Sequence, residues 1–242
     1  MIGTFKEVTE MSKTRFADSP LGKKLEGKEI DNIDLDLDSS LDAYVDDAPA
    51  DVSDENGKQY NTEMKGLLPN NTYVFNDVTY KTDDNGKIHM VYNSETRSYE
   101  LLPDNSYEIN GYKYQTDCQG RIVSAEGMLR LKNEKRDVIN TDVKDMKEGD
   151  ERGHIIADQF GGSNHIDNLV AMGFDVNRRD YKKFENMCAK EISAGKDVNV
   201  SVKLDYDDKT ARPSKFTVSY TIDGEQFERR FINYTKGENN NA

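Results

Sequence analysis

The pattern of apolar and polar positions separates an N-terminal segment from the rest of the chain. Between Glu26 and Glu55, single apolar residues are scattered among many aspartates. Such a stretch cannot bury enough apolar surface to offset the conformational entropy lost on folding. We therefore expect residues 1–58 to be an acidic disordered segment that serves as a linker or docking element. The alternation over Ile33–Asp38 leaves a second interpretation open, a strand that forms on a partner.

A 34-residue repeat follows this segment. The stretch Leu67–Tyr73 matches Leu101–Tyr107, and the match continues at the same spacing as far as Ile88 and Ile122. Alternating aromatic and β-branched residues between Asn, Asp and Gly turns predict short antiparallel hairpins, and the density of these turns excludes a helical repeat. We therefore predict a duplicated β-hairpin unit whose first copy forms a module over residues 59–109. Its aromatic residues are expected to pack in a core rather than to bind a ligand.

A helical pattern runs from Asn177 to Ala194. Its apolar residues recur at the spacing of a buried stripe, at Tyr181, Phe184, Cys188 and Ile192. Gly195 is expected to end the helix as a C′ residue. Asn177 opens the first turn, and Glu185 lies eight residues later, about 80° away on a helical wheel. Both side chains can therefore face one cavity beside the stripe.

Composition narrows the class of protein. The 242 residues include 33 basic and 46 acidic side chains, a formal charge of −13. No apolar run approaches the length of about 20 residues that spans a bilayer, and no apolar region follows a basic one at the start, so we expect neither a membrane span nor Sec export. Net acidity is not typical of a protein that stays bound to DNA, but it does not exclude an enzyme that contacts nucleic acid briefly. Two cysteines, Cys118 and Cys188, are too few for a disulfide scaffold or a zinc site, and we expect free thiols.

The charge is unevenly distributed along the chain. Residues 1–128 hold 13 basic and 25 acidic side chains, whereas residues 129–242 hold 20 and 21. In the second part, the predicted helix begins with a basic cluster formed by Arg178, Arg179, Lys182 and Lys183. Such a cluster can hold backbone phosphates without reading bases, although a solvated helix face would give the same sequence pattern.

One histidine lies in a setting that suits chemistry. His154 follows a glycine and precedes an apolar run within Gly149–Ser163, which predicts a histidine at the end of a strand. A histidine alone is more often structural than catalytic, because its near-neutral pKa suits many roles. His89 and His165 have no supporting spacing, and we expect them to be structural. Asn168 begins an Asn-Leu-Val-Ala-Met block between His154 and the helix.

In combination these blocks resemble the DNA/RNA non-specific endonucleases of the ββα-metal (His-Me finger) class, most closely the nuclease domains of bacterial polymorphic or type VII-secreted toxins. The resemblance extends from about Asn110 to Asn233. In that family a D-R-G-H or D-G-G-H signature carries the general-base histidine, which corresponds to His154. An Asn-Leu-Val-x-Met block and an N-x(7)-E pattern follow, and they correspond to Asn168, Asn177 and Glu185. The signature departs at Glu151, where relatives carry Asp, and close toxin relatives often carry Gly in place of Arg152.

The resemblance implies an α+β fold with defined site residues. Its ββα-metal nuclease core would occupy residues 110–236, including the second β repeat, and a disordered tail would follow at 237–242. The implied catalytic residues are His154, Arg152 and Glu185. One Mg²⁺ (or Mn²⁺) per active site would be held by Asn177 and Glu185, and these side chains would be supported from behind by Asn168 and Glu151. Nucleic acid would be bound by Arg178, Arg179, Lys182 and Lys183.

The chemistry of these side chains agrees with the resemblance. Phosphodiester hydrolysis needs a nucleophilic water, neutralisation of charge at phosphorus and stabilisation of the leaving 3′ oxygen, and one divalent ion can meet the last two needs. Mg²⁺ takes few protein oxygens, so Asn177 can suffice, with Glu185 holding metal-bound water. His154, with an unperturbed pKa of about 6.5, would be largely neutral near pH 7 and able to take a proton. Arg152 offers a forked donor to phosphate. Two alternatives stay open, Asn177 as a helix N-cap and Glu185 as a solvated surface residue.

We therefore expect a metal-dependent endonuclease that cleaves DNA and RNA without sequence preference. The resemblance further implies an antibacterial toxin, secreted without a Sec signal peptide or cytoplasmic before export, and held in check by an immunity protein. The basic cluster predicts an acidic inhibitor that imitates phosphate. A non-catalytic binding module with a degenerate nuclease scaffold is one alternative, against which the intact His154 and Asn177 argue. A scavenging nuclease without a toxin role is another.

Overall fold

The computed structural model describes residues 51–53, 59–61, 67–75, 78–133, 139, 141–207 and 209–235. The chain divides into two compact units, residues 1–88 and 89–242. The predicted acidic segment, apart from residues 51–53, and the predicted tail at 237–242 lie outside the described residues. In the described part of the chain, no helix combines the length and the apolar character that a bilayer crossing requires.

The first unit contains two short antiparallel strand pairs in its described part. The pairs are β1 (Asp51–Ser53) with β2 (Gln59–Asn61), and β3 (Thr72–Phe75) with β4 (Val78–Thr82). β1 falls within the range predicted to be a linker. The hairpin of β3 and β4 belongs to the first copy of the 34-residue repeat.

The hairpins of the two repeat copies are closed by the same hydrogen bonds. The hydroxyl oxygen of Thr82 accepts a hydrogen bond from the amide 11 residues earlier at 2.9 Å, and that of Thr116 accepts the same bond at 3.0 Å. Gly86 and Gly120 have φ angles of +75° and +71°, and a Cβ at either position would lie 2.1 or 2.6 Å from a backbone oxygen. Only glycine fits this turn, which explains its presence in both copies.

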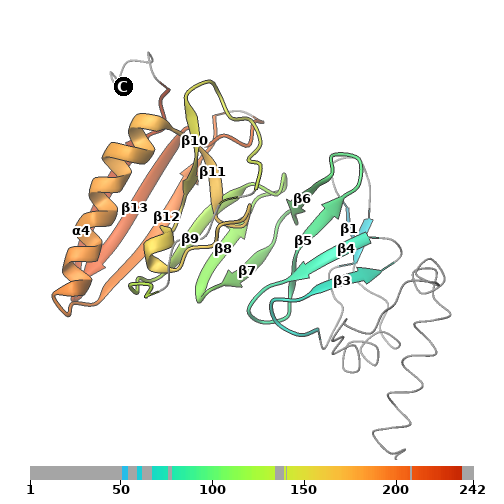
Figure 1. Ribbon diagram of the computed structural model, residues 1–242, viewed down its shortest axis with the longest axis horizontal. Coiled ribbons are helices and arrows are strands. Elements are labelled where there is room, and N and C mark those ends of the chain that lie inside the picture. The colour runs from blue at the N-terminus through green and yellow to red at the C-terminus, as the bar shows by residue number, and fades with distance from the viewer. Residues whose placement is uncertain are drawn as a thin grey trace, which may run out of the picture. The chain divides into compact units, whose positions relative to one another are not determined.

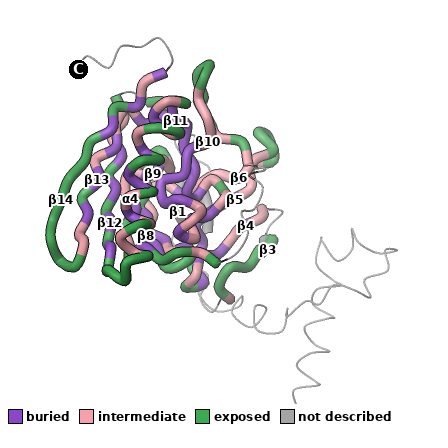
Figure 2. The backbone as a smooth tube through the Cα atoms, turned by 60° about the vertical axis from the view of Figure 1, so that its left-hand side comes forward, coloured by how far each residue is buried: buried purple, intermediate pink, exposed green. Residues whose placement is uncertain are grey.

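The second unit is built around a six-stranded antiparallel sheet with the order β14-β13-β12-β9-β8-β7 (Figure 1). The bounds of its strands are Ser106–Ile109 (β7), Tyr112–Thr116 (β8), Ile122–Met128 (β9), Val198–Asp205 (β12), Lys215–Ile222 (β13) and Glu225–Ile232 (β14). β5 (Ile88–Asn93) and β6 (Ser98–Leu101) pair with each other outside this six-stranded sheet. Buried residues alternate with exposed ones along β12 and mostly with half-buried ones along β13, so one face of the sheet carries the core. β14 is an edge strand that is exposed along most of its length (Figure 2).

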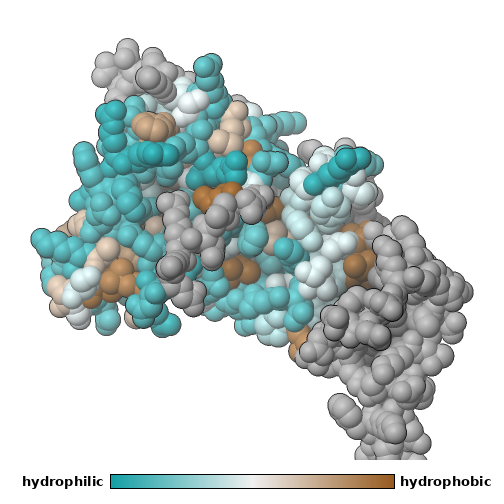
Figure 3. Space-filling view, in the orientation of Figure 1, coloured by the Kyte–Doolittle hydropathy of each residue, from teal (hydrophilic) through white to brown (hydrophobic). Residues whose placement is uncertain are grey.

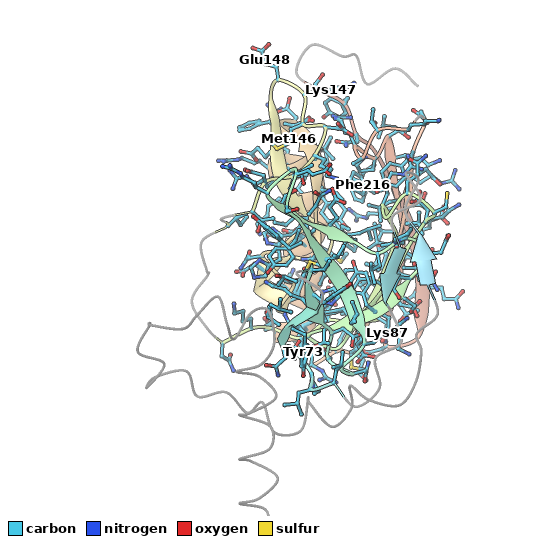
Figure 4. All side chains as sticks on the ribbon, turned by 90° about the vertical axis from the view of Figure 1, so that its right-hand side faces the viewer. Tyr73, Lys87, Met146, Lys147, Glu148 and Phe216 are labelled. Carbon is cyan, nitrogen blue, oxygen red and sulfur yellow. The ribbon has the colours of Figure 1, made fainter. Side chains whose placement is uncertain are left out.

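The predicted helix packs on this core face. A π-helix, η2 (Val176–Tyr181), continues directly into α4 (Lys182–Ser193). The predicted stripe is confirmed at its buried positions, Tyr181, Phe184 and Cys188, whereas Ile192 is half-buried. The Tyr181 ring lies 5.1 Å from that of Phe231 and 5.8 Å from that of Phe216, centroid to centroid. Phe216, a residue of β13 that is labelled in Figure 4, is fully buried. Aromatic packing therefore fixes the start of α4 on the sheet.

The geometry at the start of the helix differs from the prediction. An α-helix from Asn177 onwards is wrong, because residues 176–181 form a π-helix. The reason lies in the burial of Val176 and Tyr181, which are both 1% exposed and five residues apart. The i→i+5 bonds of a π-helix bring such residues to the same side, whereas an α-helix would separate them by about 140°.

Other predictions about the fold are confirmed. Gly195 has a φ of +84°, and its amide donates to the Ile192 carbonyl at 2.9 Å, as expected of a C′ residue. Cys118 is exposed and Cys188 is buried, and both are free thiols. Antiparallel strands with a packed helix make an α+β arrangement.

Candidate active site

A two-stranded antiparallel ladder precedes the helix in the chain. It is formed by β10 (Asp150–His154) and β11 (Leu169–Gly173), and a short 3₁₀ turn, η1 (Asp158–Phe160), lies between them. His154 is the last residue of β10 and pairs with Leu169, which confirms the predicted strand-end position. A Cβ at Gly153 would lie 2.6 Å from the Cβ of Met172. Packing of the two strands therefore requires a glycine directly before His154.

A cleft of about 910 Å³ opens beside this ladder. It gathers most of the site residues predicted from the sequence, namely Glu151, Arg152, His154, Asn177, Arg178, Lys182 and Glu185. Met146, from the loop before β10, also lines it, and Figure 4 shows this residue near Lys147 and Glu148 at one end of the unit. Side chains from a strand, a loop and a helix therefore converge on one cavity.

The orientation of the His154 ring is set by a chain of hydrogen bonds. His154 is 7% exposed, and its Nε2 lies 2.7 Å from Oδ1 of Asn164. Nδ2 of Asn164 donates to Oδ1 of Asp158 at 3.1 Å. A carboxylate can only accept, so the amide nitrogen faces Asp158 and the amide oxygen faces His154. Nε2 is therefore the protonated nitrogen of the neutral ring, and Nδ1 carries the lone pair that can accept a proton.

Glu151 fixes the side chain of Asn177. Nδ2 of Asn177 donates to Oε2 of Glu151 at 2.9 Å, so the amide oxygen points away from that carboxylate. This oxygen forms no hydrogen bond with another described residue. Arg178 donates to Glu151 through Nε at 2.8 Å and pairs with it through a terminal nitrogen at 2.6 Å, and this hydrogen bonding raises the pKa of the arginine. The N-cap of η2 is Asp175, so Asn177 does not have the capping role left open by the sequence.

Glu185 lies in the first turn of α4 and is only 8% exposed, so it is not a solvated surface residue. Its Oε2 lies 3.0 Å from Nζ of Lys182. No cluster of three or more His, Cys, Asp or Glu side chains suited to a metal ion occurs in the part of the chain that the structure describes. The amide oxygen of Asn177 and the carboxylate of Glu185 nevertheless fit an ion such as Mg²⁺, which keeps most of its waters and takes one or two protein oxygens.

The predicted basic cluster does not form one surface. Arg178 and Lys182 line the cleft, together with Arg152, whose terminal nitrogen donates to the Ile139 carbonyl at 3.0 Å. Arg179 has an exposed side chain and pairs with Asp175 at 2.8 Å. Lys183 lines a separate groove. Successive helical residues point about 100° apart, so four basic residues within six positions are distributed around the helix.

Asn168 lies outside the cleft and is fully buried. Its Nδ2 donates to the carbonyls of Ile156 and Ser163 at 2.8 and 2.9 Å. Its Oδ1 accepts from the amide of Ile156 at 2.9 Å and from the hydroxyl of Tyr114 at 3.0 Å. These four bonds hold the connection between β10 and β11 in place, including the segment that leads to Asn164.

The structure adds residues that the sequence did not indicate. Arg212 forms a buried two-point ion pair with Asp150, at 2.7 and 2.9 Å, and donates to the Asn233 carbonyl at 2.8 Å. These bonds tie the start of β10 to the C-terminal part of the unit. Their partners lie 62 and 21 residues apart, so no local pattern could reveal them. Asn164, in contrast, stands in the block directly after the histidine signature, where its polar side chain was the available signal.

The remaining histidines lie away from the cleft. His89 is 2% exposed, with Nε2 3.5 Å from Oδ2 of Asp167. Its ring lies 5.1 Å from that of Tyr107, whose hydroxyl donates to the Asp167 carbonyl at 2.8 Å. Nδ1 of His165 lies 3.4 Å from the hydroxyl of Thr141. These packing contacts agree with the structural roles expected from the sequence.

Comparison with known proteins identifies the family. A family model described as DNA/RNA non-specific endonuclease matches residues 103–224, which include β10, β11, η2 and α4. The chain is also similar to the type VII secretion system protein EssD of Staphylococcus aureus, in strains USA300, NCTC 8325 / PS 47 and Newman. In each case it is 39% identical over 90 residues, which cover 35% of this chain and only 15% of the relative. The family match covers half of the 242 residues and the whole of the cleft-forming segment between β10 and α4, and the chain therefore belongs to the DNA/RNA non-specific endonuclease family.

Proposed function

We propose that the chain is a divalent-metal-dependent endonuclease that hydrolyses phosphodiester bonds of DNA and RNA without sequence preference. The observation that carries this proposal is the convergence of His154, Asn177 and Glu185 on one cleft with cationic side chains. Membership of the nuclease family supports hydrolysis over the alternative of a non-catalytic binding module. The side chains of the cleft contact phosphates and not the edges of the bases in this proposal, so cleavage does not depend on the nucleotide sequence.

His154 acts as the general base in this proposal. The chain from Asp158 through Asn164 leaves the lone pair on Nδ1, and that nitrogen takes the proton of the attacking water. Burial of the ring and the hydrogen bond at 2.7 Å limit its rotation. The side chain therefore presents one nitrogen in a fixed direction, which general-base catalysis requires.

One Mg²⁺ or Mn²⁺ per active site completes the chemistry. The amide oxygen of Asn177 would hold it, with Glu185 binding its waters, and Glu151 keeps the amide in the required orientation. When bound, such an ion neutralises charge on the phosphate and stabilises the leaving 3′ oxygen. Arg152, Arg178 and Lys182 contribute positive charge for the substrate backbone.

The biological role is proposed to be that of an antibacterial toxin. Similarity to proteins named for type VII secretion supports export without a Sec signal, with a cytoplasmic stage before export. A nuclease produced in a cytoplasm that contains its substrate needs an inhibitor, so we infer an immunity protein as its partner. Expression in the bacterial cytoplasm separates this role from that of a scavenging nuclease. A toxin gene should arrest growth, and the His154→Ala gene should not.

The direct test is incubation of the purified chain with plasmid DNA, single-stranded DNA and RNA. Cleavage is expected with Mg²⁺ or Mn²⁺ and should stop in excess EDTA, with 5′-phosphate ends on the products. His154→Ala should lower turnover by about 10²–10⁴-fold with unchanged folding. Full activity in EDTA would contradict the metal requirement. Absence of cleavage of every substrate would favour the binding-module alternative.

A further inference from the structure

A second groove, of about 530 Å³, lies in the nuclease unit between the start of the helix and the edge strand β14. Lys183 lines it from α4, and Arg229, Arg230 and Phe231 line it from β14. It shares no lining residue with the catalytic cleft. The second groove is therefore a distinct feature of the surface.

The charges along the second groove are not balanced within the described residues. Arg230 pairs with Glu228 at 2.9 Å, and the carboxylate of Asp180 accepts from the Tyr234 hydroxyl at 3.2 Å. Neither Lys183 nor Arg229 forms an ion pair or hydrogen bond with another described residue. Lys183 and Arg229 share the groove lining with one carboxylate, Asp180, so this pair of cations leaves a net positive charge on the lining, in a chain whose net charge is −13. Such a pair favours an anionic occupant.

The second groove lies close to the cleft along the helix. Lys182 lines the cleft, and the next residue, Lys183, lines the groove. The two side chains point about 100° apart, so only the helix separates the two sites. A helix with its side chains is about 10–12 Å wide. That width corresponds to about three nucleotides at a rise of about 3.4 Å per nucleotide.

We propose that the second groove binds the phosphate backbone of a nucleic-acid strand that leaves the catalytic cleft. The inference rests on the proposed nuclease function and extends its substrate contacts beyond the scissile bond. Lys183 and Arg229 neutralise phosphates from opposite walls and leave the bases unread. The groove thereby favours long substrates over short ones, because only a strand of several nucleotides can occupy both sites.

A protein strand added to β14 is the competing occupant. Charged side chains commonly protect edge strands, which accounts for Glu228 and Arg230. That explanation does not account for Lys183, which belongs to the helix and lies on the opposite wall. A strand bound to the edge would also depend on backbone hydrogen bonds rather than on these two cations. The observed charges therefore favour a polyanion.

The test measures binding and cleavage separately, with one variant on each wall. Binding of a 30-nucleotide single-stranded DNA to the full chain carrying His154→Ala is followed by fluorescence anisotropy over a range of salt concentrations. Adding Arg229→Glu or Lys183→Glu should weaken binding and make the slope of log K against log[salt] shallower by about 0.7 per lost phosphate contact. The control is Lys113→Glu on β8, four strands from β14 and about 19 Å away, which should retain the original slope.

Cleavage gives the second measurement. For proteins with His154 intact, kcat/KM is measured for the 30-nucleotide DNA and for the small ester bis(p-nitrophenyl) phosphate. Either groove variant should lower the ratio of the DNA value to the ester value about tenfold, because the small ester cannot reach the groove. Thermal melts check folding. Unchanged salt slopes and unchanged kcat/KM ratios in both groove variants would overturn the proposal. Polyglutamate serves as an acidic peptide for comparison, and groove variants that lose polyglutamate binding but keep DNA binding would also overturn it. If the unmodified chain cleaves neither substrate, the proposed nuclease function fails, while the salt slopes still decide whether the groove binds DNA.

Discussion

Oδ1 of Asn164 lies 2.7 Å from Nε2 of His154, and this contact determines which nitrogen of the neutral ring carries the lone pair. The bond depends on the loop between β10 and β11, which the buried side chain of Asn168 holds through four hydrogen bonds. We therefore propose that Asn168 acts on the site through the loop, whereas Asn164 positions the His154 ring by direct contact.

Replacing Asn164 should impair catalysis without preventing folding. Asn164→Ala removes the acceptor for Nε2, so turnover should fall by about 10–100-fold, the size seen when partners that orient histidines in metal sites are removed. Asn164→Asp places a negative charge beside the ring and favours the imidazolium. The neutral base then exists only at higher pH, so the acidic limb of the pH–rate profile should move to higher pH. Exposed Asn199 provides the control through Asn199→Ala, and unchanged profiles in both Asn164 variants would contradict the positioning role.

Asn177→Ala should act on the metal rather than on the base. Loss of the amide oxygen should raise the Mg²⁺ concentration for half-maximal activity, with partial recovery of activity at high Mg²⁺. Calorimetric titration of Mn²⁺ in the absence of substrate gives a second readout. Arg179→Ala is the matched control, because this neighbour pairs with Asp175 outside the cleft. An Asn177→Ala protein with unaltered metal titrations would show that Asn177 is not a ligand.

The ion pair of Arg212 and Asp150 should be important for stability. The two side chains are 6% and 0% exposed, so Arg212→Ala leaves a buried carboxylate without its charged partner. The free energy of unfolding should fall by about 3–5 kcal/mol, measured by urea denaturation at pH 7. Lys203→Ala removes an ion pair to Asp205 near the surface and should cost less than about 1 kcal/mol. Similar losses of unfolding free energy in the two variants would show that burial of the ion pair does not determine its contribution to stability.

The two cysteines should react at very different rates. Burial is the largest cause that raises the pKa of the Cys188 thiol, to about 12. A raised pKa lowers the thiolate fraction, which at pH 8 would be about one ten-thousandth for Cys188. Exposed Cys118 should therefore react rapidly with a disulfide reagent, and the second thiol only after unfolding. Cys118→Ser should abolish the rapid phase. Two equally fast thiols in the folded protein would contradict this assignment.

The proposed immunity protein should recognise the cations of the cleft. Arg178 and Lys182 offer a target for an acidic partner, so association should slow as ionic strength rises. The double charge reversal Arg178→Glu and Lys182→Glu should weaken binding, with Lys113→Glu as the control for the change in net charge. An inhibitor that still protects after the double reversal, or that contacts only residues before Gly120, would bind elsewhere.

The sequence predicted correctly those positions whose geometry depends on neighbouring residues in the chain. The strand-end position of His154 follows from Gly153, and the helix end follows from the positive φ of Gly195. The pairing of Asp150 with Arg212 could not be predicted, because 62 residues separate them and only the tertiary fold brings them together. The basic cluster was predicted as one surface because a linear sequence does not show the direction of each side chain. Its division between cleft and groove depends on helical phase.

The π-helical turn η2 restricts which insertions and deletions the chain can tolerate. Removing one residue between Asn177 and Tyr181 would allow regular α-helical bonding to extend backwards from α4, and Val176 would stay on the side of Tyr181, because four α-helical residues end about 40° from a full turn. Adding one residue there would instead turn Asn177 by about 100° relative to the stripe anchored by Tyr181. Insertions in this turn should therefore inactivate the protein while leaving it folded. Added residues at Gly195 or Gly224, where a Cβ would meet no atom within 4 Å, should be accommodated at the surface. Insertions among active relatives should accordingly occur at those turns and be absent from η2.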